Sequence, residues 1–395
     1  MDNNVIVSLK GPERVRKRPA VIFTSDGIEG ANYAVKMLLD MFITEAALGF
    51  SQELIVTINK DNAVRIKSFD RGFILDETLV DGKAIWEYDF CELYAAPRHK
   101  EEGYYFSLGY EKNHNEMYGA ADLPFPKYRA GEIFDLGLCC VQYASEYMEV
   151  EAVHKNIRKH VSFKKGYCAS KLTHETTTSE PYTLIEFKLD KDVFSDITIT
   201  YNSLASVLKY AAMTIPGFKT TIEDERSSET NTYLYPEGII GYAKEKTDGV
   251  SVAPFYVKEI ETVGKDRYNR KEYDARIKVV LSFSCQPGLI ECIHNYGFLE
   301  YGGNHLRAGI DSIKKTVDWR LLHLDGHPEL TIDDICGKMI LILETNCSSK
   351  ATCWENATKK AITNKMITDM CVDLFDDDFC YYIEKNKEAI ISVLK

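Results

Sequence analysis

The clearest hydrophobic pattern near the start of the chain is the segment Asn32–Phe50, NYAVKMLLDMFITEAALGF. Its apolar residues recur at the spacing of one helical face, so the pattern predicts a single amphipathic helix over about residues 32–48. Residues 53–70, ELIVTINKDNAVRIKSFD, instead alternate apolar and polar positions around a turn at Asp61–Asn62. That alternation predicts a β-hairpin.

The rest of the first half is less regular. Residues 71–129 are rich in aromatic residues, glycine and charge and have poor periodicity, which indicates loops and short helices. An apolar helix is expected over Leu136–Tyr147. Three strands should follow it, over Met148–His154, Arg158–Lys164 and Tyr182–Lys188.

A domain boundary is expected between about residues 195 and 235. The helical pattern of Ser203–Phe218 is stopped by Pro216–Gly217, and a polar hairpin follows. Beyond it the pattern predicts strands over residues 275–285 and 338–344, with a helix over 304–323 between them. A helical region should follow from residue 357 onward. We therefore predict an α+β chain of two domains, 1–215 and 216–395, a division consistent with its length.

Composition narrows the class of protein. With 45% hydrophobic and 27% charged residues the chain resembles an ordinary globular protein. No apolar run approaches the ~20 residues that cross a bilayer. The odd number of cysteines, 11, and the lack of a C-x-x-C pair favour reduced thiols over a disulfide framework or a zinc site. We expect a cytoplasmic protein without a membrane partner.

The net charge of −12 argues against a surface that follows a phosphate backbone as a whole. Two local basic segments stand out against it, RVRKRP (Arg14–Pro19) and HKNIRKHVSFKK (His154–Lys165). For each, a solvated edge is the favoured interpretation and a nucleic-acid site the alternative.

Four blocks carry a resemblance to a known family. They are LKGPERVRKRPAVIF (Leu9–Phe23), LLDMFITEAALG with the hairpin that follows, YGGNHLRAG (Tyr301–Gly309) and TNCSSKATCWENA (345–357). In this order and spacing they resemble the ATPase region of the DNA gyrase B subunit and of its topoisomerase IV counterpart. The resemblance implies a gyrase, Hsp90, histidine-kinase and MutL type of ATPase sandwich, a mixed sheet with helices on one face. A transducer domain like the ribosomal protein S5 domain 2-like fold should follow.

The resemblance also implies where nucleotide chemistry would be. Aligned through Asp40 and Glu45, the positions of the family's general base and magnesium ligand fall on Met37 and Met41. A thioether accepts no proton at neutral pH and is a poor ligand for magnesium, which prefers oxygen. Glu45 and Arg71 match a family ion pair near the site.

The adenine side of the implied site also differs from the family. The family's aspartate aligns with Ser68, and the first glycine of its turn with Asp70, while Gly72 and Thr183 match. A second register, left open here, gives Asp70 itself the adenine role. The family's third-strand arginine appears as His154.

The phosphate side is altered in the same way. The glycine-rich lid is reduced to Gly131 and Gly137, with Glu132 and Asp135 between them, which would repel a polyphosphate. The family's phosphate-binding lysine falls near Thr352, and Lys350 is the nearest substitute.

Three hypotheses follow. The first is a pseudo-ATPase without a catalytic residue, cofactor or metal, which acts as a dimerising or regulatory module. Its partner would be a second copy, joined through the N-terminal arm, or a gyrase or topoisomerase subunit, with DNA contacted only indirectly. The second is a divergent but active ATPase subunit that uses ATP and magnesium, with Glu45 or Asp40 as base. The third is a small-molecule site in the remodelled cleft.

Overall fold

The computed structural model describes residues 9–47, 49–76, 78, 82–93, 138–265, 272–322, 330–347, 352–355 and 360–394. The chain divides into two compact units. The first runs to Ala212 and takes in Phe218–Leu234, and the second contains Met213–Gly217 and Tyr235–Lys395. Each unit is described by itself below.

The first unit is built on one mixed sheet, for which the described residues supply nine strands in the order β5-β4-β3-β7-β2-β1-β8-β9, with β6 beside β4. Strands β1 and β8 are parallel, whereas the other pairs are antiparallel. The strands are β1 (Glu53–Ile58), β2 (Val64–Phe69), β3 (Ser145–His154), β4 (Ile157–Lys164), β5 (Tyr167–Cys168), β6 (Thr173–Thr176), β7 (Tyr182–Leu189), β8 (Lys219–Asp224) and β9 (Glu229–Tyr233).

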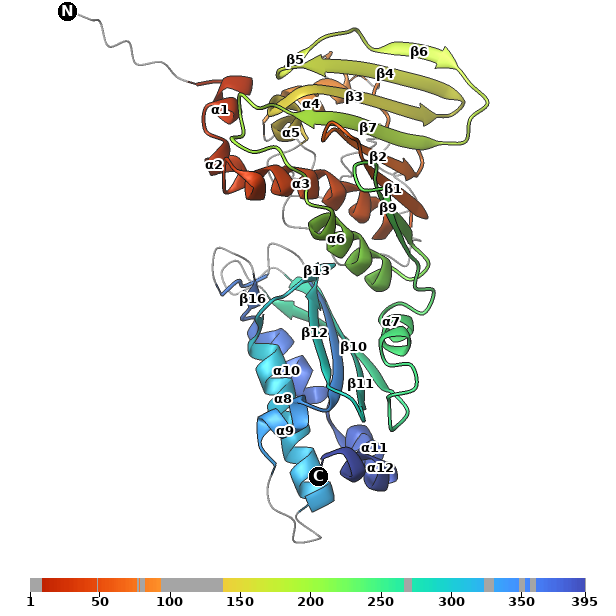
Figure 1. The fold of residues 1–395 in the computed structure, drawn as a ribbon, viewed down its shortest axis with the longest axis vertical. Helices are drawn as coiled ribbons and strands as arrows, with labels where there is room; N and C mark the ends of the chain where they lie inside the picture. Colours follow the sequence, from red (N-terminus) through yellow and green to blue (C-terminus); the bar gives the residue numbers. More distant parts are fainter. Residues whose placement is uncertain are drawn as a thin grey trace, which may run out of the picture. The chain divides into compact units, whose positions relative to one another are not determined.

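Helices cover one face of this sheet (Figure 1). They are α1 (Pro12–Arg16), α2 (Pro19–Phe23), α3 (Ile28–Ala47), α4 (Ile85–Cys91), α5 (Cys139–Tyr143) and α6 (Tyr201–Thr214). The rings of Trp86 and Phe90 on α4 pack against Phe163 of β4, with centroids 6.0 and 5.6 Å apart. The expected mixed sheet with helices on one face is therefore confirmed.

Helix α3 begins at Ile28, four residues before the predicted start. Asn32, at that predicted start, is almost fully buried, and its amide is engaged on both sides. Its Nδ2 donates to the carbonyls of Ile28 and Thr198, and its Oδ1 accepts from the N–H of Thr200. Asn32 therefore anchors the helix to the segment before α6 and does not cap it.

The predicted helix over 136–147 is too long at its C-terminal end. Helix α5 ends at Tyr143, and strand β3 begins at Ser145. Every residue of α5 is buried, so the apolar run that suggested a longer helix continues directly into a buried strand. Periodicity alone cannot separate those two cases in so short a segment.

The second unit contains a five-stranded sheet in the order β10-β11-β15-β12-β13 and a short parallel pair, β14 with β16, among the described residues. Strands β12 and β15 are parallel, and the connection between them carries helix α8. The strands are β10 (Tyr256–Lys265), β11 (Glu272–Phe283), β12 (Leu289–His294), β13 (Gly297–Phe298), β14 (Gly302–Gly303), β15 (Met339–Cys347) and β16 (Ala361–Ile362).

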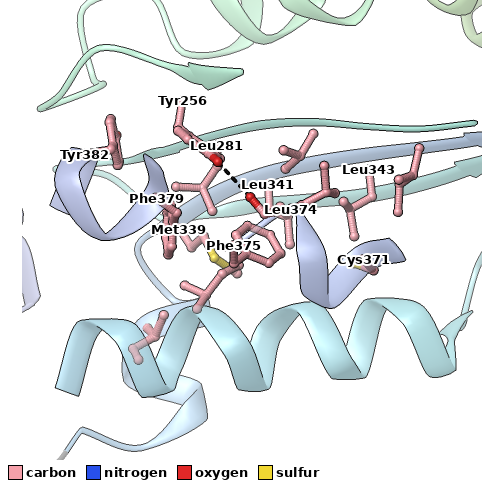
Figure 2. Packing of buried hydrophobic residues seen from close by; sticks show 14 of the residues in the cluster. Tyr256, Leu281, Met339, Leu341, Leu343, Cys371, Leu374, Phe375, Phe379 and Tyr382 are labelled. Carbon is pink, nitrogen blue, oxygen red and sulfur yellow. Dashed lines mark hydrogen bonds between the residues drawn. The ribbon is translucent and has the colours of Figure 1, made fainter. Parts of the chain in front are cut away.

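The helices of this unit supply one side of its core. They are α7 (Ile239–Lys246), α8 (Asn304–Val317) with the π-helical turn Asp318–Leu322, α9 (Ile332–Cys336), α10 (Lys365–Asp373), α11 (Asp377–Lys385) and α12 (Lys387–Leu394). Figure 2 shows alternate residues of β11 and β15, such as Leu281 and Leu341, packed against Phe375 and Phe379. The Tyr256 hydroxyl donates to the carbonyl of Leu374 at 2.7 Å, so it is paired inside this core.

Candidate functional site

Helix α3 carries the two methionines at the positions where the resemblance implies chemistry. Met37 and Met41 have no exposed surface, and their i, i+4 spacing places them on the same side of the helix. Both thioethers are part of the apolar core of the first unit. The donor set at these two positions therefore does not fit a magnesium ion or a proton-accepting base.

The ion pair implied between Glu45 and Arg71 is present and bidentate. Arg71 Nε and Nη2 donate to the two carboxylate oxygens of Glu45, at 3.0 and 3.2 Å. The Glu45 side chain is 2% exposed and that of Arg71 12%, and the guanidinium also lies 4.0 Å from the ring centroid of Phe50. Because both oxygens of Glu45 are engaged, this carboxylate holds α3 to the turn after β2.

That turn places the carboxylate of Asp70 at the end of β2. Its Oδ1 accepts from the N–H of Gly72 and from the hydroxyl of Thr183 on β7, both at 2.9 Å. The Thr183 hydroxyl in turn accepts from the N–H of Phe73 at 3.2 Å. Asp70 and Thr183, which the sequence assigned to one cleft, are therefore joined by one direct hydrogen bond, and the N–H groups of Gly72 and Phe73 each donate to one of the two side chains.

Asp70 is a buried acid with one satisfied oxygen. Burial raises its pKa to about 6, although the Gly72 N–H, the hydroxyls of Thr183 and Ser68 and the charge of Arg71 each act to lower it. Among the described residues its Oδ2 has no hydrogen-bond partner. The second register, in which Asp70 is the recognition carboxylate, therefore has a geometric basis.

Ser68 does not reach the same position. It is fully buried at the register point opposite Thr183, and its hydroxyl lies 2.9 Å from the hydroxyl of Ser51. This pair of hydroxyls ties β2 to the residues that precede β1. The hydroxyl of Ser68 therefore links β2 to Ser51. The carboxyl group beside Thr183 belongs to Asp70, two residues later.

Gly72 is required by the path of the chain at this turn. Its φ is +73°, and a Cβ there would lie 1.9 Å from the carbonyl oxygen of Val153 on β3. The neighbouring His154 donates from Nδ1 to the carbonyl of Arg71 at 2.7 Å. His154, which aligns with a family arginine, therefore braces the turn that presents Asp70.

In the second unit, Thr352 is hydrogen-bonded to a buried histidine. Thr345 donates its hydroxyl proton to the carbonyl of Ile293, so it accepts from Nδ1 of His294 at 2.9 Å. Nε2 of His294 then accepts from the hydroxyl of Thr352 at 3.0 Å. Burial lowers the pKa of His294 to about 3, which keeps the ring neutral at ordinary pH.

Two further contacts fix this segment. The ring of Trp354 meets that of His294 edge-on, with centroids 5.7 Å apart. The Cys353 N–H donates to Asn364 Oδ1 at 2.7 Å. The sequence signalled Thr352 only through the resemblance, and nothing in it marked His294, because the partners lie far apart along the chain.

The G-G-N-H block is also explained by packing. Gly303 has φ of +134°, and a Cβ there would lie 2.0 Å from the carbonyl oxygen of Ile362, so β14 and β16 can pair only around a glycine. His305 is buried with Nε2 at 3.0 Å from the Cys292 sulfur, and burial lowers its pKa to about 4.

Three of the predicted site residues, Gly131, Gly137 and Lys350, lie outside the described residues, as do Glu132 and Asp135. Within the described part of the chain, no group of three or more histidine, cysteine, aspartate or glutamate side chains is arranged to hold a metal ion. No helix of that part is both long and apolar enough to cross a membrane.

The fold is similar to the ATPase-plus-transducer region of the DNA gyrase B subunit and of its topoisomerase IV counterpart. Comparison with solved structures supports it. The B subunit of DNA gyrase from Myxococcus xanthus matches with a TM-score of 0.68 at 14% identity, over 97% of this chain and 98% of that one. The 43K ATPase domain of Thermus thermophilus gyrase B, in complex with an aminocoumarin, matches with 0.65 at 18% identity, over 97% and 94%.

Curated gyrase B sequences are also similar to this chain. The DNA gyrase B protein of Staphylococcus aureus is 23% identical over 403 residues, covering 98% of this chain and 56% of that protein. Its Thermus thermophilus counterpart is 23% identical over 262 residues, covering 65% of this chain and 38% of that protein. No family model matches. The chain is thus distantly similar over its full length to the gyrase B and topoisomerase IV ATPase region, and it spans 38% to 56% of these relatives.

Proposed function

We propose that the chain is a gyrase B-like module related to DNA topology change that does not hydrolyse ATP and acts by dimerising or by regulating a partner. The observation that carries the proposal is the burial of Met37 and Met41 in α3. General acid–base assistance is worth ~10²–10⁴ in rate, and the metal-assisted stabilisation of a transferring phosphoryl group adds to it. A chain with methionine at the positions of the general base and of the magnesium ligand lacks both contributions.

The remaining groups support the same proposal. Glu45, one of the substitutes for the missing base, has both oxygens bound to Arg71. Thr352, at the phosphate-lysine position, bonds to His294 in its own unit. The partner would be a second copy joined through the N-terminal arm, or a gyrase or topoisomerase subunit, in a cytoplasmic setting.

A second candidate function has one observation in its favour. Asp70, Thr183 and Gly72 form a hydrogen-bonded unit. Its remaining carboxylate oxygen, Asp70 Oδ2, is buried and has no hydrogen-bond partner among the described residues. Such a group fits a neutral ligand that donates a hydrogen bond, as a nucleobase or another small molecule does. Under this alternative the chain is a divergent ATP-binding subunit or a small-molecule module.

Nucleotide binding and turnover separate the candidates. We expect no magnesium-dependent ATP hydrolysis above background and no thermal stabilisation by a non-hydrolysable ATP analogue. Binding would stabilise the folded state by RT ln(1 + [L]/Kd). Stabilisation by adenosine but not by the triphosphate would favour the small-molecule alternative, and brisk turnover would reject the pseudo-ATPase.

A further inference from the structure

Strand β10 forms one edge of the sheet of the second unit, and among the described residues it is paired only with β11. The two strands are in unbroken antiparallel register, from Tyr256 opposite Leu281 to Lys265 opposite Glu272. Over these residues, all of them described, β10 contains no proline and no bulge, the usual devices that stop an edge from pairing with another chain. Its outward N–H and C=O groups are therefore arranged to accept one further strand.

One face of this edge offers apolar side chains at alternate positions. Val257 and Val263 are 41% and 56% exposed, and Glu261 between them is exposed as well. The three side chains lie on the same face, because successive residues of a strand point to opposite sides of the sheet. A strand added beside β10 would place its own alternate residues directly opposite the two valines, so β-branched residues fit these positions.

The other face of the edge is bordered by the acidic start of α11. Tyr256 of β10 packs against Phe379 of α11, with ring centroids 5.1 Å apart (Figure 2). Lys258 Nζ lies 2.5 Å from Asp376 Oδ2 and 3.3 Å from Asp378 Oδ2. Because one lysine is shared between two carboxylates, a negative charge remains on this face.

Other charges of the edge add to this surplus. Glu261 on the strand and Asp377 at the start of α11 are exposed, and the described residues offer neither an ion pair. Glu259 is by contrast held by Arg276 and Lys278, each at 3.4 Å. A second copy of this chain would bring the same negative surplus to the edge, whereas a strand rich in lysine or arginine would neutralise it.

We propose that this surface, the β10 edge (Val257, Glu261, Val263 and Asp376–Asp378), binds an extended basic segment of another protein as an added strand. Main-chain hydrogen bonds to β10 supply the affinity, and the two faces supply the selectivity. Basic residues of the segment lie on the side of α11, and β-branched residues alternate with them on the side of the valines. The proposed regulatory module thereby gains a place for a partner that does not involve the nucleotide cleft.

The test uses the full chain and a fluorescein-labelled peptide of alternating lysine and valine as long as β10, without nucleotide, so its result does not depend on the proposed loss of ATP hydrolysis. The variant is Glu261→Lys/Asp377→Lys. The matched control, Glu245→Lys/Asp311→Lys, makes the same charge change at exposed carboxylates of the same unit outside the edge. A second peptide of equal charge, with two adjacent prolines at its centre, separates strand pairing from charge attraction. Thermal unfolding confirms that both variants fold.

We expect the wild type and the control to bind the alternating peptide, and the bound peptide to slow hydrogen exchange at alternate amides of β10. Binding should be at least roughly tenfold weaker for the Glu261/Asp377 variant, which repels the lysines, and for the proline peptide, which cannot complete the ladder.

Equal binding by the variant or by the proline peptide, an equal weakening in the control, or absence of binding would overturn the proposal. Slower exchange only outside β10 would overturn it as well. So would a dimer of the peptide-free wild type that Val263→Lys dissociates in analytical ultracentrifugation, since a second copy would then occupy the edge.

Discussion

At the scale of residues, Met37 and Met41 carry the proposed loss of nucleotide chemistry. Met37 and Met41 sit on a helix whose other features match the family, yet their side chains are core atoms. The sequence identified both substitutions because helical spacing and an alignment through Asp40 and Glu45 are local information. Their complete burial could not be predicted from the sequence, because it depends on strands that are distant in the chain.

Replacing Met41 by asparagine, the residue implied for the family's metal site, should therefore destabilise the fold. A buried amide without a partner costs about 1–3 kcal/mol, and the lost apolar packing adds to this cost. Met41→Leu, which keeps volume and polarity, should cost less than about 1.5 kcal/mol. Urea unfolding of the two variants measures the difference. An asparagine variant as stable as wild type would mean that the site is polar after all.

Asp70 gives a prediction for pH. Its pKa is raised to about 6 in the folded chain, against about 3.9 when unfolded. Below pH of about 4 both states hold the proton and Asp70 imposes no penalty. As pH rises from about 4 through 6 the unfolded state loses the proton first, so the folded state becomes relatively less stable.

Asp70→Asn keeps the Oδ1 acceptor for Gly72 and Thr183 and removes the charge. The variant should match wild type near pH of about 4 and exceed its free energy of unfolding by roughly 3 kcal/mol above pH of about 6. Denaturant unfolding at several pH values measures the difference. A constant difference across this range would show that Asp70 is not held as a buried acid.

At the scale of elements, the long periodic segments were predictable from the sequence and the short ones were not. The hairpin β1–β2 and the strands β4 and β7 agree with the alternation of apolar residues, whereas β11 and β15 contain continuous buried runs. The helix predicted around α5 was too long, because its apolar run continues into β3. The two-residue strands β14 and β16 had no signal, since they depend on Gly303 lying against Ile362.

The turn after β2 can be tested through its glycine. Gly72→Ala places a methyl group 1.9 Å from the Val153 carbonyl and keeps a positive φ, so we expect a loss of several kcal/mol or failure to fold. Gly49→Ala has a similar φ of +82° and open space around it, so only a conformational cost of roughly 1–2 kcal/mol is expected. Equal losses in thermal unfolding would contradict the close approach of the turn to β3.

The segment after β15 is predicted to be held by the His294–Thr352 hydrogen bond. Thr352→Val leaves Nε2 of His294 buried without its donor and should cost about 1–3 kcal/mol. Thr352→Ser keeps the hydroxyl and serves as the control. Hydrogen exchange of residues 352–355 should accelerate in the valine variant only, and equal protection in both would show that this bond does not hold the segment.

At the scale of the whole molecule, the chain combines two compact units whose fold is similar to that of the gyrase B ATPase and transducer region. The resemblance was recognisable because its blocks are spread along the sequence, and full-length structural matches now support it. Contacts between segments that are distant in the sequence could not be predicted in the same way. The turn after β4 lies against the start of α1, where a Cβ on Gly166 would be 2.7 Å from the Pro12 Cβ.

The central claim is that the nucleotide chemistry of this framework has been lost, and magnesium-dependent ATP hydrolysis by the purified full chain tests it most directly. A competent gyrase B protein assayed in parallel provides the positive control. We predict phosphate release indistinguishable from that of a no-enzyme control, with or without DNA. Turnover that depends on magnesium and disappears when the Asp70–Thr183 pair is removed would contradict the account.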